Sequence, residues 1–219
     1  MADLVIFGAG DIARLAHHYF STDSAHRVVA FTVDAEFKQA DTFCGLPVVP
    51  FHEVAVAFPP ESFGMFVAMS YARMNQVRAS KYAAAKALGY TLASYVSSRC
   101  SFLTQSPCGD NCFVLEDNTV QPFVTVGNNV TLWSGNHIGH DSTIADHCFI
   151  SSHVVVSGHV HVGTHCFIGV NATIRNNVAL GDRTLVGAGA LIMKNTAPGS
   201  VYVAGRTDKF SKTSDQVDL

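Results

Sequence analysis

Hydrophobic residues recur at every sixth position through the C-terminal half of the chain. A helix repeats near 3.6 residues and a strand at two, so a strict period of six fits neither as one long element. It predicts a chain that turns a corner every six residues and stacks its coils as a parallel β-helix. The series is unbroken for fourteen repeats, each of them Val, Leu or Ile: Val114, Val120, Val126, Leu132, Ile138, Ile144, Ile150, Val156, Val162, Ile168, Ile174, Leu180, Val186 and Ile192.

A second position, two residues before each of these, holds small or β-branched residues. Three of the six cysteines fall there, at Cys112, Cys148 and Cys166, so we expect them to fill the core as reduced thiols. Three hexads make one coil of eighteen residues. Residues eighteen apart should therefore stack at about the 4.8 Å spacing of neighbouring strands.

The first part of the chain has a different pattern, in which apolar runs alternate with segments of helical spacing. This alternation predicts a parallel sheet covered by helices, that is, a Rossmann-like domain over 1–95 followed by the β-helix domain over 96–219. The region 36–60 reads as loops around a short strand, and Gly89 is placed to end the second helix. The predicted strands are 4–8, 28–34, 65–70 and 91–96, and the predicted helices are 11–20 and 73–88.

A glycine loop joins the first strand to the first helix. Its sequence, Gly8-Ala-Gly10-Asp-Ile-Ala13, has the spacing of a dinucleotide-binding turn, and Asp34 ends the second strand where a ribose-binding acid would lie. Such glycines let backbone N–H groups approach a phosphate at a helix N-terminus. The alternatives are NAD, a nucleotide-linked sugar and a purely structural turn. The sugar nucleotide is favoured because this half is too short for a complete dinucleotide domain.

Seven of the eleven histidines lie within one stretch of the β-helix. One interpretation is a zinc site of the γ-class carbonic anhydrase type, which needs two histidines five residues apart; that spacing is absent here, so no metal is expected. The other is a single general base. The seven are His137, His140, His147, His153, His159, His161 and His165.

His140 is the best candidate for this base. Asp141 follows it and can orient the imidazole, and Gly158 lies one coil further on. A glycine stacked on the base leaves room for a ligand and an open N–H. A base beside an N–H donor is the minimum machinery for acyl transfer, because one removes a proton and the other stabilises the oxyanion.

Composition and charge mainly argue against certain classes of function and location. The formal net charge of −3 gives no reason to expect binding to nucleic acid or to a membrane surface. The first ten residues, MADLVIFGAG, lack the basic start of a signal peptide, and no apolar run approaches membrane-spanning length. We therefore expect a cytoplasmic protein.

Taken together, these motifs resemble the bacterial sugar acyltransferases of the NeuD and PglD type. The similarity covers nearly the whole chain, although the usual closing Gly-x-Pro-Ala is missing at 204–209, which leaves the path of the last ten residues open, and the block 133–137 is bulkier than usual. The matching segments are Phe7–Gly10, Gly139–Ile144, Gly158 with Val160 and Gly163, Phe167–Ile174, and Leu185–Ala190.

This resemblance implies a left-handed β-helix, a homotrimer, and acetyl-CoA lying between neighbouring β-helices. His140 and Asp141 would be the base and its acidic partner, and Gly158 would supply the N–H near the thioester. The expected activity is N-acetylation of a nucleotide-linked amino sugar. The alternatives are O-acetylation, as in sialic acid modification, a metal-dependent lyase on the same scaffold, and a non-catalytic scaffold. The implied cofactor-binding residues are Gly158, Asn171, Ala172, Gly187, Ala188, Gly189 and Ala190, and the substrate-binding residues are Gly8, Gly10, Asp34 and His137.

Overall fold

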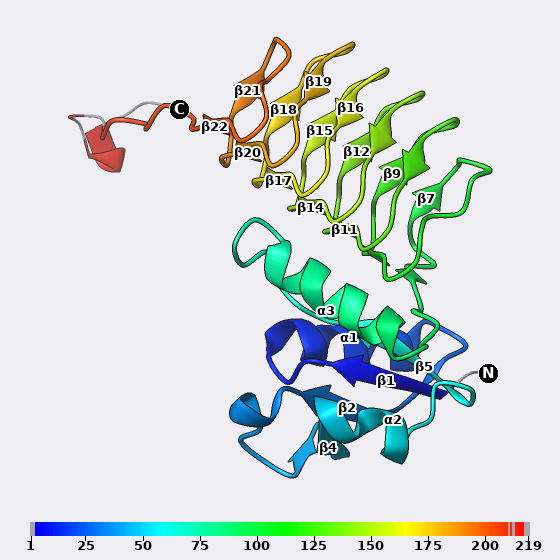
Figure 1. Ribbon diagram of the computed structural model, residues 1–219. Coiled ribbons are helices and arrows are strands. Elements are labelled where there is room, and N and C mark those ends of the chain that lie inside the picture. Colours follow the sequence, from blue (N-terminus) through cyan, green and yellow to red (C-terminus); the bar gives the residue numbers. More distant parts are fainter. Residues whose placement is uncertain (1–2, 210, 212, 217–219) are drawn as a thin grey trace.

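The computed structural model describes residues 3–209, 211 and 213–216, and it consists of an α/β domain packed against a β-helix (Figure 1). The α/β domain has one five-stranded sheet in the order β3-β4-β2-β1-β5, parallel except for β3, which pairs antiparallel with β4. Its strands are β1 (Asp3–Phe7), β2 (Arg27–Val33), β3 (Thr42–Phe43), β4 (Leu46–Pro50) and β5 (Phe63–Val67). Its helices are α1 (Asp11–Thr22), α2 (Val54–Ala57) and α3 (Gln76–Ala87), with 3₁₀ turns at Ala35–Phe37 and Phe51–Glu53.

Two predicted elements of this domain are wrong in their details. The predicted strand 91–96 does not join the sheet: only Leu92 bridges Met65, and Tyr95–Val96 forms β6 in the β-helix. An apolar run predicts a strand but does not specify its partner. The predicted helix 73–88 begins at Gln76, because the three residues before it have φ between 51° and 63°, outside the right-handed helical region.

The β-helix is built from two-residue strands in three parallel sheets. The first sheet has the order β22-β20-β17-β14-β11-β8-β6, the second β21-β18-β15-β12-β9-β7, and the third β10-β13-β16-β19. The strands are β6 (Tyr95–Val96), β7 (Ser101–Phe102), β8 (Phe113–Val114), β9 (Thr119–Val120), β10 (Thr125–Val126), β11 (Thr131–Leu132), β12 (His137–Ile138), β13 (Thr143–Ile144), β14 (Phe149–Ile150), β15 (Val155–Val156), β16 (His161–Val162), β17 (Phe167–Ile168), β18 (Thr173–Ile174), β19 (Ala179–Leu180), β20 (Leu185–Val186), β21 (Leu191–Ile192) and β22 (Val201–Tyr202).

The core of the β-helix confirms the period of six. All fourteen hexad residues are buried in one cluster, and Cys112, Cys148 and Cys166 lie beside them as free thiols. The eighteen-residue coil is also confirmed, since Thr131 pairs with Phe149 and Phe149 with Phe167. Each stacked pair buries apolar surface against the next, and this burial is what stabilises a chain with such short strands.

Most corners of the β-helix contain one residue in the left-handed backbone conformation. Asn, Asp and His tolerate this conformation better than most residues. Four of the clustered histidines occupy such corners, with φ between 56° and 65°: His147, His153, His159 and His165. Corner geometry therefore explains much of the histidine enrichment.

Helix α3 attaches the α/β domain to the first sheet (Figure 1). The buried guanidinium of Arg78 donates to Thr131 Oγ1 at 2.6 Å and to the carbonyl oxygens of His147 and Cys148, both at 3.1 Å. Asn75 donates to the carbonyl oxygens of the next coil, at His165 and Cys166. The two domains are thus joined by hydrogen bonds from the buried side chains of Arg78 and Asn75 to the coils of the β-helix.

After β22, a 3₁₀ turn at Ser214–Gln216 is the last element that the structure describes. Residues 205–209 are exposed. The last ten residues, 210–219, whose path the sequence left open, fall partly outside the described residues. Among the helices described, none has the length and apolarity needed to cross a bilayer.

Candidate active site

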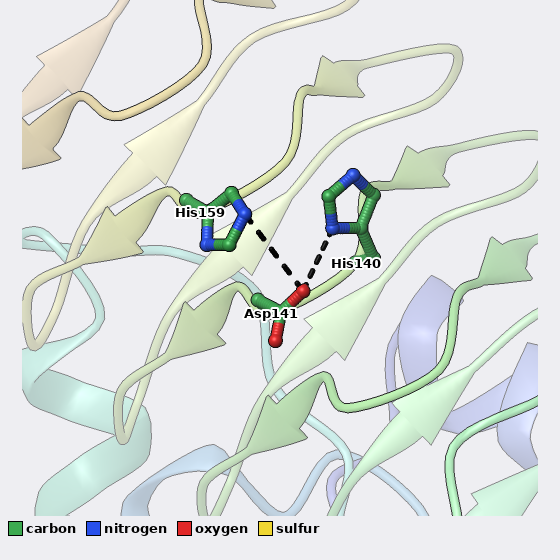
Figure 2. Close-up of side chains that lie close together, drawn as sticks. All are labelled: His140, Asp141 and His159. Atoms are coloured by element: carbon green, nitrogen blue, oxygen red, sulfur yellow. Dashed lines mark hydrogen bonds and ion pairs between the residues drawn. The ribbon is translucent and has the colours of Figure 1, made fainter.

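His140 and Asp141 occupy the corner between the second and third sheets, just after β12. Figure 2 shows the imidazole turned toward the carboxylate, and His140 Nδ1 lies 2.8 Å from Asp141 Oδ2. The backbone N–H of His140 donates to Gln121 Oε1 at 2.9 Å, which fixes the start of the corner. A carboxylate at Nδ1 favours the tautomer with its proton on that atom, leaving Nε2 as a proton acceptor.

Gly158 lies directly on the other side of this imidazole. A Cβ built on Gly158 would be 2.8 Å from His140 Nε2 and 2.9 Å from Cε1, so any larger residue would push the ring away. Among the described residues, no acceptor takes the Gly158 N–H. The equivalent N–H of His140 is satisfied by Gln121, whereas the residue that matches Gln121 one coil on is Gly139, which has no side chain.

His159 is a neighbour of this pair that sequence reasoning missed. It lies eighteen residues after Asp141, and its Nε2 is 3.9 Å from Asp141 Oδ2 (Figure 2). The two imidazoles pack edge to face with ring centroids 5.0 Å apart. Ligand atoms of His140, Asp141 and His159 all lie within 4.8 Å of one another, so these three side chains could hold a metal ion. The coil spacing was the signal that could have found His159.

A pocket of about 710 Å³ lies between the two domains. The α/β domain contributes the glycine loop from Gly8 to Ile12 together with Asp34 and Lys81. The β-helix contributes Trp133, Phe149, Ser151, Ser152 and Val170. The pocket therefore joins the glycine loop to a wall that contains two aromatic side chains.

The two glycines of the loop differ in what they do. Gly8 has φ of +125°, and a Cβ there would be 2.7 Å from the carbonyl oxygen of Ala68, so the fold itself requires glycine. Gly10 has an ordinary extended backbone, and a Cβ there would meet no atom within 4 Å. Neither strain nor packing explains glycine at position 10, which instead leaves open space at the N-terminus of α1.

The acidic groups near the loop are paired with cations. Asp34 Oδ1 accepts from Lys81 Nζ at 2.7 Å, and Asp11 Oδ1 lies 3.0 Å from Arg14 on the same helix. Lys81 also lies over the ring of Phe7 at 5.6 Å. Its ammonium offsets the carboxylates around the pocket, a contribution that the sequence did not reveal.

The remaining expected site residues lie in two places on the β-helix, one group at a corner between sheets and one residue in a strand. Asn171, Ala172 and 187–190 share the corner between the first and second sheets, one coil apart, and the aromatic wall of the pocket begins at the same corner. His137 lies in β12 and, like His140, is outside the lining of the pocket as described. Within one chain the candidate base and the pocket thus occupy separate corners.

Comparisons with known proteins agree with this architecture. Residues 123–158 and 159–194 match the family described as bacterial transferase hexapeptide (six repeats). The acetyltransferase domain of PglB from Neisseria gonorrhoeae, solved with acetyl coenzyme A, is 22% identical, with a TM-score of 0.78 over 92% of this chain and 96% of that one. PerB from Caulobacter crescentus, solved with CoA and GDP-perosamine, is 21% identical, with a TM-score of 0.81 over 93% and 95%.

Curated relatives match a shorter stretch. An acyl-[acyl-carrier-protein]–UDP-N-acetylglucosamine O-acyltransferase from Stutzerimonas stutzeri is 46% identical over 39 residues, which is 18% of this chain and 15% of that protein. The chain thus spans only a small part of the length of the curated relatives it matches. The repeat match over 123–194 and the likeness to the PglB domain over 93% of this chain confirm the expected architecture, a Rossmann-like domain followed by a left-handed β-helix of hexapeptide repeats.

Proposed function

We propose that the protein is an acetyl-CoA-dependent sugar acyltransferase that N-acetylates an amino sugar carried on a nucleotide. The observation that carries this proposal is the arrangement at one corner of the β-helix. His140 has its Nδ1 held by Asp141, while Gly158 leaves the Nε2 edge open and has an N–H that no acceptor takes in the part of the chain that the structure describes. The acetyl-CoA and nucleotide-sugar complexes of proteins with the same fold support the choice of substrates.

In the proposed reaction the sugar amine attacks the carbonyl carbon of the thioester. His140 Nε2 accepts the proton that the amine loses as the C–N bond forms, and Asp141 stabilises the resulting imidazolium. The Gly158 N–H donates to the carbonyl oxygen as negative charge develops there. The C–S bond then breaks, and the CoA sulfur takes a proton from His140, which returns the base to its starting state.

The substrates are assigned to separate surfaces. The nucleotide diphosphate lies at the open side of Gly10, with Asp34 near the ribose, and the pantetheine arm follows Asn171, Ala172 and 187–190. Because the pocket and His140 occupy different corners, we propose a homotrimer in which the base of one chain serves the pocket of its neighbour. His137 would face the acceptor near that junction.

A hydroxyl acceptor is the second candidate. It is favoured by the 46% identity to the O-acyltransferases, which covers only 39 residues. The discriminating experiment supplies acetyl-CoA with nucleotide-linked sugars that carry either an amine or only hydroxyls, and detects the acetylated product by mass spectrometry. Acetylation of the amino sugar supports the proposal; acetylation of hydroxyl sugars alone supports the second candidate; no product with any acceptor, despite bound acetyl-CoA, contradicts both.

A further inference from the structure

The corner that carries the candidate base also has the composition of a transition-metal site. His140 and His159 point to the same Asp141 carboxylate oxygen, at 2.8 Å and 3.9 Å (Figure 2). Tetrahedral zinc, with bonds of about 2.0–2.1 Å, places its ligand atoms about 3.4 Å apart. The three ligand atoms are already near that spacing, since the two histidine nitrogens lie 2.8 Å and 3.9 Å from Asp141 Oδ2 and all three atoms lie within 4.8 Å of one another.

The backbone holds the three residues in place. Asp141 and His159 occupy equivalent corner positions on consecutive coils, with φ of 57° and 58°. The backbone N–H of His159 donates to the carbonyl oxygen of His140 at 2.9 Å and ties the two coils together. Metal binding would therefore require little reorganisation of the chain.

The types of ligand atom at this corner, and their exposure, indicate which kind of metal ion would bind. Two imidazoles and one carboxylate suit zinc and related transition metals, whereas magnesium prefers oxygen ligands. In the single chain the side chains of His140, Asp141 and His159 are 52%, 42% and 55% exposed, which leaves room for an ion and for water in its fourth position.

We propose that this corner binds Zn²⁺ reversibly, through His140 Nδ1, Asp141 and His159 Nε2, and that the bound ion switches the base off. A neutral imidazole that coordinates metal through Nδ1 carries its proton on Nε2. The proton of His140 thus moves, through solvent, from the atom that faces Asp141 to the atom that should accept the substrate proton. The ion also occupies the carboxylate that would stabilise the imidazolium. The inhibitory consequence rests on the function proposed above; the binding does not.

Binding is tested first, on tag-free protein and without substrates. Zinc titration by calorimetry should give a site that His159→Asn weakens by about 10–100-fold or more, because even an outer partner of a metal ligand is typically worth that much. Asn fits this corner, since the next coil has Asn177 at the equivalent position with φ of 60°. The matched control is His153→Asn, an exposed corner histidine with φ of 56°, which should keep the wild-type affinity. Equal zinc affinity in wild type and His159→Asn, or equal weakening by both variants, overturns the proposal.

Inhibition is tested second, by mass spectrometry of the acetylated sugar, because zinc would bind the CoA thiol in an assay based on thiol release. Each variant is scored by the ratio of its activity with zinc to its activity without zinc. Zinc should lower this ratio in the wild type and in His153→Asn, magnesium should not, and His159→Asn should be resistant. Zinc that binds at this corner without lowering activity overturns the switch. Failure of the transferase assay itself would contradict the proposed function and leave the binding result standing.

Discussion

Gly158 lies against the imidazole of His140 so closely that a single methyl group at position 158 would come within 2.8 Å of Nε2. The contact follows from the eighteen-residue coil, which stacks residue 158 directly on residue 140. Two residues that are far apart in the sequence are thereby fixed by the strand register, without a flexible loop. Because the backbone holds the two residues in place, single substitutions at either position can test the contact.

The first prediction is that Gly158→Ala displaces the base while leaving the fold intact. The clash is with the far end of a half-exposed side chain, and Gly158 does not have a positive φ, so the protein should lose little stability. We expect kcat to fall toward the loss caused by His140→Ala. The double variant Gly158→Ala/His140→Ala should be no slower than His140→Ala alone, since both act on one group. Additive losses would show that Gly158 acts independently of His140.

The second prediction concerns the base itself. His140→Ala should lower kcat by about 10²–10⁴-fold, the usual contribution of a general base, while acetyl-CoA still binds. Asp141→Asn keeps the shape of the side chain but removes its negative charge, so its loss should be smaller. Steady-state kinetics with calorimetric measurement of acetyl-CoA affinity separates these effects. Undiminished activity in a correctly assembled His140→Ala protein would move the catalytic role to another histidine of the cluster, with His137 tested next.

The third prediction concerns the glycine loop. Gly10→Val should project a side chain into the open space beside α1, so the KM for the nucleotide-linked acceptor should rise while acetyl-CoA affinity is retained. The matched control is Gly205→Val, because that glycine also has no atom within 4 Å of a Cβ but lies outside the lining of the pocket. Gly8→Val should instead destabilise the domain, because its Cβ would meet backbone at 2.7 Å. An equal loss of both ligands in Gly10→Val would argue against this division of the surface.

The β-helix was predictable from sequence because its register is repetitive. Each corner repeats after six residues and each contact after eighteen, so the stacking of Gly158 on His140 could be counted along the chain. The same count of eighteen residues leads from Asp141 to His159.

Contacts between the domains could not be predicted in the same way. Lys81 and Arg78 are both cations on one surface of α3, yet one pairs with Asp34 in the pocket and the other is buried on the β-helix. Helical spacing says which residues share a face, but the partner of that face depends on tertiary packing.

The fourth prediction tests the attachment of the domains. Arg78→Ala removes a buried guanidinium and takes this donor away from Thr131 Oγ1 and from the His147 carbonyl oxygen, while the Cys148 carbonyl oxygen keeps only its bond from the Thr131 N–H; the free energy of unfolding should fall by about 3 kcal/mol or more. Burial lowers the pKa of Arg78 to about 10, so it is charged at neutral pH. Urea unfolding measures the effect, and exposed Arg14→Ala serves as the control, with an expected change of about 0.5 kcal/mol or less. Equal effects of the two substitutions would show that the contact is not stabilising.

The fifth prediction concerns the dependence of stability on pH. Burial, and secondarily the neighbouring His165, lower the pKa of His147 below its ordinary value of 6.5. Its Nδ1 accepts from the Asn129 amide at 2.9 Å, a bond that protonation would break. The unfolded chain binds this proton near pH 6.5 and the folded chain only at lower pH. The stability that depends on neutral His147 is therefore complete above pH 6.5 and is lost as the pH falls through that value toward the folded pKa.

His147→Asn is the variant that tests this linkage. Asparagine suits the left-handed corner, where φ is 65°, and would extend the ladder in which Asn111 donates to Asn129. Urea unfolding at pH 8, 7, 6 and 5 should give a shallower loss of stability in the variant than in the wild type. The comparison at pH 8 isolates the change in packing, because His147 is neutral there in both the folded and the unfolded chain. The nearby charges of Asp110, Asp146 and Arg78 are present in both proteins, so the difference in slope between them reports His147 together with its effect on His165. Identical slopes would show that the folded and unfolded chains bind the His147 proton equally well.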